Sequence, residues 1–178
     1  MKRNRYKSCL LLFLYLFLMS AVTHATESTV QPVGSMPEDS TLAVTAKETG
    51  FDETTGYYIC RGAVRLEIDS LVIFADTAKI SADRRGVWTQ GNTKLIDGDE
   101  TFTSDALYAN LETDTAWFFD SRSLLRHPGL SIESDTARYD WKNRIATFDG
   151  HVIYIKSAAE KACPHLTYSV DEDTLQEN

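Results

Sequence analysis

Residues 71–80 read LVIFADTAKI, and residues 130–139 read LSIESDTARY. In both segments apolar and polar side chains alternate up to the aspartate, as in a half-buried strand, and the alternation then slips by one position. Such a slip is typical of a β-bulge or corner, where one extra residue keeps the same face inward. The small residues Ala75 and Ser134 stand just before the slip, where a crowded bend favours them. Each segment therefore predicts a strand that bends at its aspartate.

The same pattern recurs along the chain with a period of about 29 residues. Asp76, Asp105 and Asp135 occupy equivalent positions, and one period back from the first of them stands Lys47. One period forward from Asp135 stands Pro164, where a further copy begins and is cut short. Three of these positions are followed fifteen residues later by a glycine, namely Gly62, Gly91 and Gly150. About five repeats therefore make up the chain after residue 40.

Each repeat is predicted to be a strand, a tight turn and a second strand. The turns are rich in charged and turn-forming residues, and they lie at 52–56, 83–86, 112–115, 142–144 and 171–174. No stretch after residue 40 has a convincing helical period. The sequence therefore predicts an all-β stack of bent hairpins. The third repeat departs from the pattern, because Asp120, Arg122 and Leu124 continue the series of inward positions.

The first 25 residues are predicted to be an export signal. Four basic residues among the first seven precede 14 nearly unbroken apolar residues at 9–22. A spanning helix needs about 20 such residues, whereas a secretory signal needs fewer and ends in small residues, as at Thr23-His24-Ala25. We expect residues 1–25 to be a cleaved signal peptide, 26–40 a flexible leader and 41–178 the folded domain. An uncleaved membrane anchor is the alternative.

The charge and the histidine spacing exclude several classes of function. Removal of residues 1–25 takes four of the 18 basic side chains and none of the 26 acidic ones, which leaves a formal charge of −12. So acidic a chain repels a phosphate backbone, which excludes nucleic acid as a partner. His127, His151 and His165 have no zinc-type spacing and are expected to be lone surface histidines. With no nucleophile elbow or phosphate loop either, we expect no enzyme activity, no cofactor and no metal site.

The remaining polar and thiol groups are interpreted as structural. The repeated aspartates are expected to accept hydrogen bonds from backbone donors at the bends. The acidic segment 97–100 is too short for a calcium loop and is expected to be a turn. Cys60 and Cys163 belong to the first and last repeats, several strands apart, so no disulfide between them is expected. They are small buried residues, or they link neighbouring molecules.

Two segments carry a resemblance to a known family. Residues 102–109 (FTSDALYA) and 130–139, each followed about a dozen residues later by an apolar strand, resemble the OstA-like family. That family includes the periplasmic lipopolysaccharide-transport protein LptA and the N-terminal domain of LptD. The resemblance spans residues 42–178 and implies a β-jellyroll, a solenoid-like stack of bent antiparallel strands that is open at both ends.

The resemblance also implies a function. The protein would lie in the periplasm, bind lipopolysaccharide, and carry its lipid A acyl chains along an apolar interior between the inner and outer membranes. LptC-like and LptD-like jellyroll proteins, or further copies of the chain, would join it end to end. The acidic exterior suits an amphiphile whose anionic head stays in solvent, and unpaired strands at both ends favour edge-to-edge addition.

The inward-facing apolar residues are the candidate contacts for acyl chains. They are Leu71, Ile73, Ile80, Phe102, Leu107, Phe118, Leu130, Ile132, Tyr139, Phe148 and Val152. The same side chains would fill any closed β-core, so one alternative is a structural solenoid that polymerises end to end without a ligand. Another alternative is a membrane-tethered LptC-type component in which residues 9–22 are retained.

Overall fold

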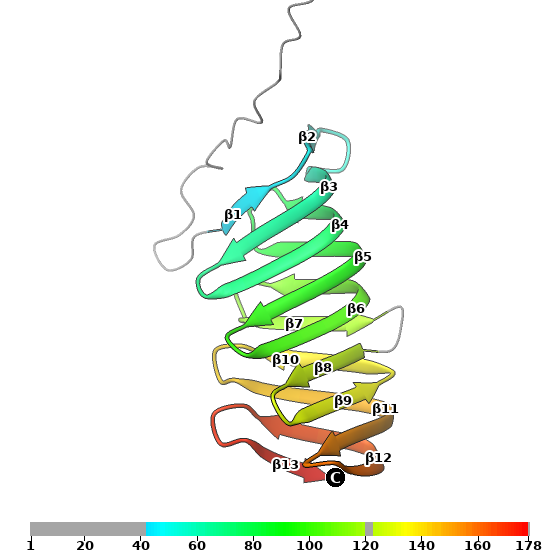
Figure 1. The fold of residues 1–178 in the computed structure, drawn as a ribbon. Helices are drawn as coiled ribbons and strands as arrows, with labels where there is room; N and C mark the ends of the chain where they lie inside the picture. The colour runs from blue at the N-terminus through cyan, green and yellow to red at the C-terminus, as the bar shows by residue number, and fades with distance from the viewer. Residues whose placement is uncertain (1–41, 120–122, 178) are drawn as a thin grey trace, which may run out of the picture.

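The computed structural model describes residues 42–119 and 123–177, and the regular structure of this part is entirely β. Its thirteen strands form one antiparallel sheet, whose strands are stacked along a long axis from the N-terminal to the C-terminal repeat (Figure 1). The all-β stack predicted from the alternation is confirmed. Within the described residues, no helix has the length and apolar character needed to cross a membrane.

Six strands have 11 or 12 residues and run through a bend, and the shorter strands lie on one side of a bend only. In chain order the strands are β1 (Leu42–Thr45), β2 (Glu48–Asp52), β3 (Tyr57–Ile68), β4 (Leu71–Ser81), β5 (Gly86–Asp97), β6 (Glu100–Asn110), β7 (Thr115–Phe119), β8 (Ser123–His127), β9 (Leu130–Ser134), β10 (Thr136–Asp140), β11 (Ile145–Lys156), β12 (Ala159–Ser169) and β13 (Thr174–Glu177). The five predicted turns lie between strands, within a residue or so of their predicted bounds.

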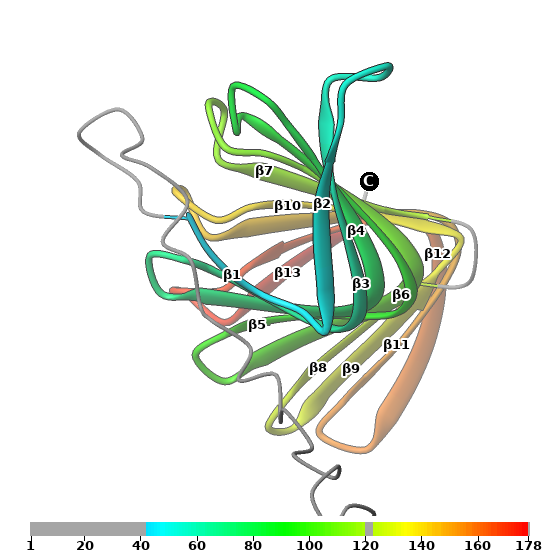
Figure 2. The ribbon, with the colours of Figure 1, turned by 90° about the horizontal axis from the view of Figure 1, so that it is seen from above.

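The bends fold the sheet into two arms, which diverge when the molecule is seen along its axis (Figure 2). The first arm contains β2, β7, β10, β13 and the turns at 82–85, 111–114, 141–144 and 170–173. The second arm contains β1, β8, β9 and the turns at 69–70, 98–99, 128–129 and 157–158. The six long strands run through both arms. The core therefore lies between two faces of one folded sheet.

Each bend is a bulge in which two residues of one strand face one residue of the next. Gly91 and Asn92 of β5 stand opposite Asp105 of β6, and both have a left-handed backbone, with φ of +79° and +49°. A Cβ atom on Gly91 would lie 2.5 Å from Oδ2 of Asp76 on the other neighbouring strand. The equivalent Gly150 is equally confined by Asp135. The aspartate and the glycine fifteen residues later are thus neighbours on adjacent strands at the bend. The predicted slip is confirmed.

The third repeat is interrupted between its two halves. β7 and β8 both pair with β6, one on each side of the bend. Asp120 and Arg122 lie outside the described residues, so the expectation for their side chains is untested. The prediction that Leu124 faces inward is wrong, because Leu125 is completely buried whereas Leu124 is half-buried. The inward series changes parity between Phe118 and Ser123, which are both buried and stand five positions apart.

Candidate functional site

The interior between the arms is apolar along the length of the stack. All eleven residues predicted as lipid contacts lie there, and none is more than 4% exposed. At the centre, Phe102 stacks on Phe118 and Tyr139, with ring centroids 5.0 and 4.6 Å apart. The side chains pack against one another, so the interior of this structure is a closed core. Their contact with a lipid remains a prediction.

Along one long side of the molecule, the turns of the first arm face the turns of the second arm. We call this side the mouth. Each of three first-arm turns folds an apolar residue inward there, namely Leu111, Trp141 and Val170. The backbone N–H of each donates to a carbonyl of the preceding first-arm turn, at 2.8, 3.0 and 3.0 Å. The alternation of apolar and polar residues did not predict that these three turn residues are inward, although their positions recur with the period of the repeat.

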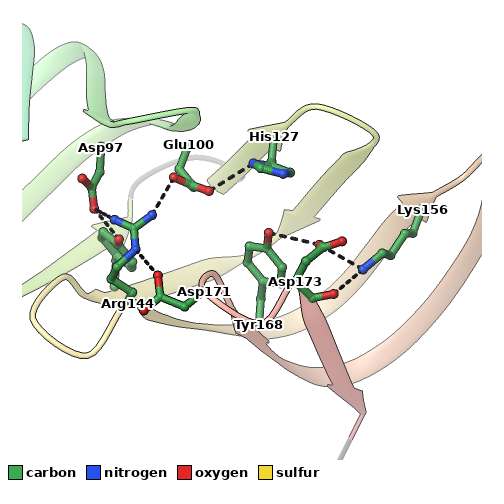
Figure 3. A network of polar contacts seen from close by, with 9 residues as sticks. Asp97, Glu100, His127, Arg144, Lys156, Tyr168, Asp171 and Asp173 are labelled. Carbon is green, nitrogen blue, oxygen red and sulfur yellow. Dashed lines mark hydrogen bonds and ion pairs between the residues drawn. The ribbon is translucent and has the colours of Figure 1, made fainter.

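Charged groups cross the mouth at its middle (Figure 3). Arg144, in a first-arm turn, donates from Nη1 to Asp97 Oδ2 at 2.7 Å and from Nη2 to Glu100 Oε2 at 3.2 Å. Both carboxylates flank a second-arm turn and are buried, with side chains 6% and 3% exposed, whereas Arg144 is 30% exposed. We call these three residues the clasp. Arg144 Nε also donates to Asp171 of the next first-arm turn at 2.7 Å.

The clasp continues into the aromatic core through Tyr139. The Tyr139 hydroxyl donates to Asp97 Oδ2 at 2.5 Å. Burial, together with this bond to a carboxylate, holds the pKa of Tyr139 far above its ordinary value. One of the predicted lipid contacts therefore has an apolar ring in the core and a polar tip on the clasp.

Three further polar contacts join the arms towards the C-terminal end. Lys156 of the second arm lies 3.0 Å from Asp173 Oδ1 in a first-arm turn. The hydrogen bond from Lys156 is the main cause of a lowered pKa at Asp173. Glu177 of β13 accepts a hydrogen bond from Tyr154 and pairs with Lys161 at 3.5 Å, both on the second arm. The mouth is thus bridged at several levels in the C-terminal half.

The histidines were predicted as lone surface residues; His151 does lie on the surface, but His127 is largely buried, and each of the three has a carboxylate beside it. His127 Nδ1 is 3.0 Å from Glu100 Oε1, although off the line of a hydrogen bond, and its side chain is only 23% exposed. His151 Nδ1 lies 2.7 Å from Asp135 Oδ2, and His165 Nδ1 lies 2.5 Å from Asp149 Oδ1. In each of the last two pairs the sequence separation is the same, which places the members opposite each other at a bend.

Two interpretations of acidic residues also need correction. Backbone donors were expected for the repeated aspartates, but two of them bond with side chains: Asp76 Oδ2 accepts a hydrogen bond from Asn92 Nδ2 at 2.8 Å, and Asp135 Oδ2 lies 2.7 Å from His151 Nδ1. In both cases the partner is the residue after the bend glycine, Asn92 after Gly91 and His151 after Gly150. The segment 97–100 does form a turn, but two of its carboxylates are buried against Arg144 rather than solvated.

The two ends of the stack differ in character. At the N-terminal end Phe51 of β2 is 49% exposed and packs on Tyr58, with centroids 4.9 Å apart. At the C-terminal end the outermost inward positions hold the charged pair Lys161 and Glu177. Cys60, near the first end, is buried, and Cys163, near the other, is half-buried; both are free thiols. Burial raises the pKa of both.

The fold was compared with known proteins. No protein-family model matches the chain, and no curated protein matches it. Among solved structures the chain is similar to LptH of Pseudomonas aeruginosa, described as the LptA homologous periplasmic component of the conserved lipopolysaccharide transport device. The TM-score is 0.57 and the identity 15%, over 64% of this chain and 87% of LptH.

The chain has an LptA-like fold. The resemblance read from residues 102–109 and 130–139 is therefore confirmed for the fold. An LptA-like stack at such low identity is understandable, because its shape depends on inward apolar parity and on a small or glycine residue at each bend. Neither requirement fixes the identity of the remaining side chains.

Proposed function

We propose that the chain is a periplasmic lipopolysaccharide-transport protein, whose interior carries acyl chains between the inner and outer membranes. The supporting observation is the apolar interior of an LptA-like stack, which continues from Leu42 on β1 to Leu175 on β13. The acidic exterior leaves an anionic headgroup in solvent. By the same resemblance, LptC-like and LptD-like proteins or further copies would meet its two ends.

The energetics suit a carrier. Burial of one methylene contributes roughly 0.8 kcal/mol, so six methylenes of one acyl chain contribute about 5 kcal/mol before ordering costs. Several chains then give micromolar binding that still permits release. Because the interior is packed, each chain entering it must separate side chains of opposite arms, and the clasp opposes that separation. Acyl binding and opening of the mouth are therefore coupled.

A photo-crosslinker at Ile132 tests the proposal. Ile132 is completely buried at the centre of the stack, and its neighbour Ser131 lies on the outer face of the same strand. After incubation with lipopolysaccharide, we expect an adduct carrying acyl chains at position 132 and none at position 131. Equal labelling at both positions contradicts the proposal, as does an absence of adduct at position 132 in a folded protein.

One observation favours a second function. Since the predicted lipid contacts are at most 4% exposed, the structure suits a structural solenoid that assembles end to end without a ligand. That solenoid predicts no acyl adduct at Ile132. The tethered LptC-type alternative depends on residues 9–22, which lie outside the described residues. An intact mass equal to that of residues 26–178 supports a cleaved signal peptide and contradicts a membrane tether.

A further inference from the structure

A row of aromatic side chains crosses the outer face of the first arm. Trp88, Tyr108 and Trp117 are register partners on β5, β6 and β7, and we call them the aromatic stripe. Their rings stack with centroids 4.8 and 5.4 Å apart. At one end the Arg138 guanidinium lies 5.9 Å from the Trp117 ring centre. At the other end Trp88 has Lys79 as its register partner and contacts the Tyr57 ring edge-on, with centroids 5.4 Å apart.

The stripe is unexpected for the outer face of a sheet. Outward positions of an antiparallel sheet with one buried face are normally polar. Here three consecutive outward positions are aromatic, and Trp88 is 36% exposed. The flanking residues are basic although the chain as a whole is acidic. Tryptophan, tyrosine and arginine together are also the residues that dominate binding surfaces.

A hollow of about 230 Å³ lies beside the stripe. Its outward lining includes Thr77, Lys79, Trp88, Gln90, Ala106 and Phe119. Ala106 pairs with Gln90 and with Phe119, and its small side chain leaves the space between them empty. The hollow thus offers two aromatic walls, an amide, a hydroxyl and an ammonium group.

The stripe lies close to the mouth. Trp88 is two residues from Gly86, where β5 leaves its first-arm turn, which is roughly 7 Å at the rise of a strand. The Trp88 ring leans towards Gly86: a Cβ atom on Gly86 would lie only 2.7 Å from Cη2 of Trp88. A group that leaves the mouth over the first-arm turns would therefore come close to the stripe.

We propose that the aromatic stripe and its hollow bind the anionic saccharide of the lipid whose acyl chains enter the interior. This inference rests on the proposed function. The C–H faces of sugar rings are apolar and pack on exposed aromatic surface, which Trp88 and Phe119 supply in the hollow. Hydroxyl groups of the sugar bond with Gln90 and Thr77. Lys79 and Arg138 pair with its phosphate or carboxylate groups.

The test uses the saccharide alone. Phosphorylated saccharide, released from lipopolysaccharide by removal of all acyl chains, is titrated calorimetrically into the exported chain. We expect saturable binding that weakens at least tenfold in Trp88→Ala and in Ala106→Leu, which fills the hollow and keeps the stripe. The matched control is Phe74→Ala. Phe74 is 37% exposed on the outer face of the second arm and also lies under a cation, Arg65, at 5.9 Å.

The outcomes separate this inference from the proposed function. No binding of the saccharide, or an equal loss in Phe74→Ala, overturns the saccharide site even if Ile132 captures acyl chains. Saccharide binding that both stripe variants abolish supports the site, and capture at Ile132 in Trp88→Ala then shows that the interior is intact. A stripe that instead mediates association of two copies, seen as a dimer lost in Trp88→Ala without saccharide binding, overturns the inference.

Discussion

Replacement of Arg144 by methionine removes the cation of the clasp and keeps most of the aliphatic length. Two carboxylates, Asp97 and Glu100, then remain in a site where their side chains are 6% and 3% exposed. Loss of one partner from a buried ion pair costs about 3–5 kcal/mol, because the remaining charge stays desolvated. Arg144 is partly exposed, Tyr139 still donates to Asp97, and His127 still lies beside Glu100. We therefore expect the lower limit, about 3 kcal/mol.

Urea unfolding of the protein measures this loss. With a slope of about 2 kcal/mol per molar urea, the midpoint should fall by roughly 1.5 M. Arg85→Met is the matched control, since Arg85 occupies the equivalent turn position two repeats earlier. Its partner Glu112 is 3.5 Å away and both side chains are more than half exposed, so the loss should stay below about 1 kcal/mol.

A companion variant separates charge from packing. When Asp97→Asn and Glu100→Gln accompany Arg144→Met, no uncompensated charge remains in the clasp, and most of the lost stability should return. Equal unfolding midpoints for Arg144→Met and Arg85→Met would refute the reasoning. A triple variant no more stable than Arg144→Met would show that the loss comes from packing of the arginine stem.

Three further predictions concern the core, the bends and the ends. Burial and Asp97 raise the pKa of Tyr139, whereas an unfolded tyrosine ionises at about pH 10. The stability linked to this group is therefore complete below about pH 10 and declines above it. A tyrosinate absorbance titration should show Tyr139 ionising only when the protein unfolds. Gly91→Ala should cost about 1–3 kcal/mol from its positive φ and the Asp76 contact, while Gly50→Ala, with nothing near its Cβ, should be close to neutral in the same unfolding assay. Phe51→Asp should weaken concentration-dependent self-association, measured by sedimentation velocity, if the exposed Phe51 end of the stack binds another copy. Ile145→Asp, at the start of β11, is the control. An unchanged profile for Phe51→Asp, or an equal effect from Ile145→Asp, would contradict association through the Phe51 end.

The fold was predictable because its signal repeats. Asp76 and Gly91 touch at a bend, so their fifteen-residue spacing recurs wherever the bend recurs. The clasp was missed because Arg144 lies in a turn, and its partner Asp97 is 47 residues away, at the end of β5. A signal was nevertheless present, since Asp97 continues the inward series of Leu95. Aspartate at an inward position implies a buried partner, but alternation cannot say which cation supplies it.

The hydrogen bonds that link successive first-arm turns, such as Leu111 N–H to the Arg85 carbonyl, repeat with each copy. The backbone hydrogen bonds between neighbouring first-arm turns are therefore the same along the stack, although the side chains at each level differ. Each copy adds two strands, which lengthens the interior by roughly 10 Å. Duplication or loss of one repeat would change the reach of the protein in steps of that size and leave the remaining junctions unaltered. The length of the path inside the molecule is thus a property that can vary by whole repeats, independently of what lines it.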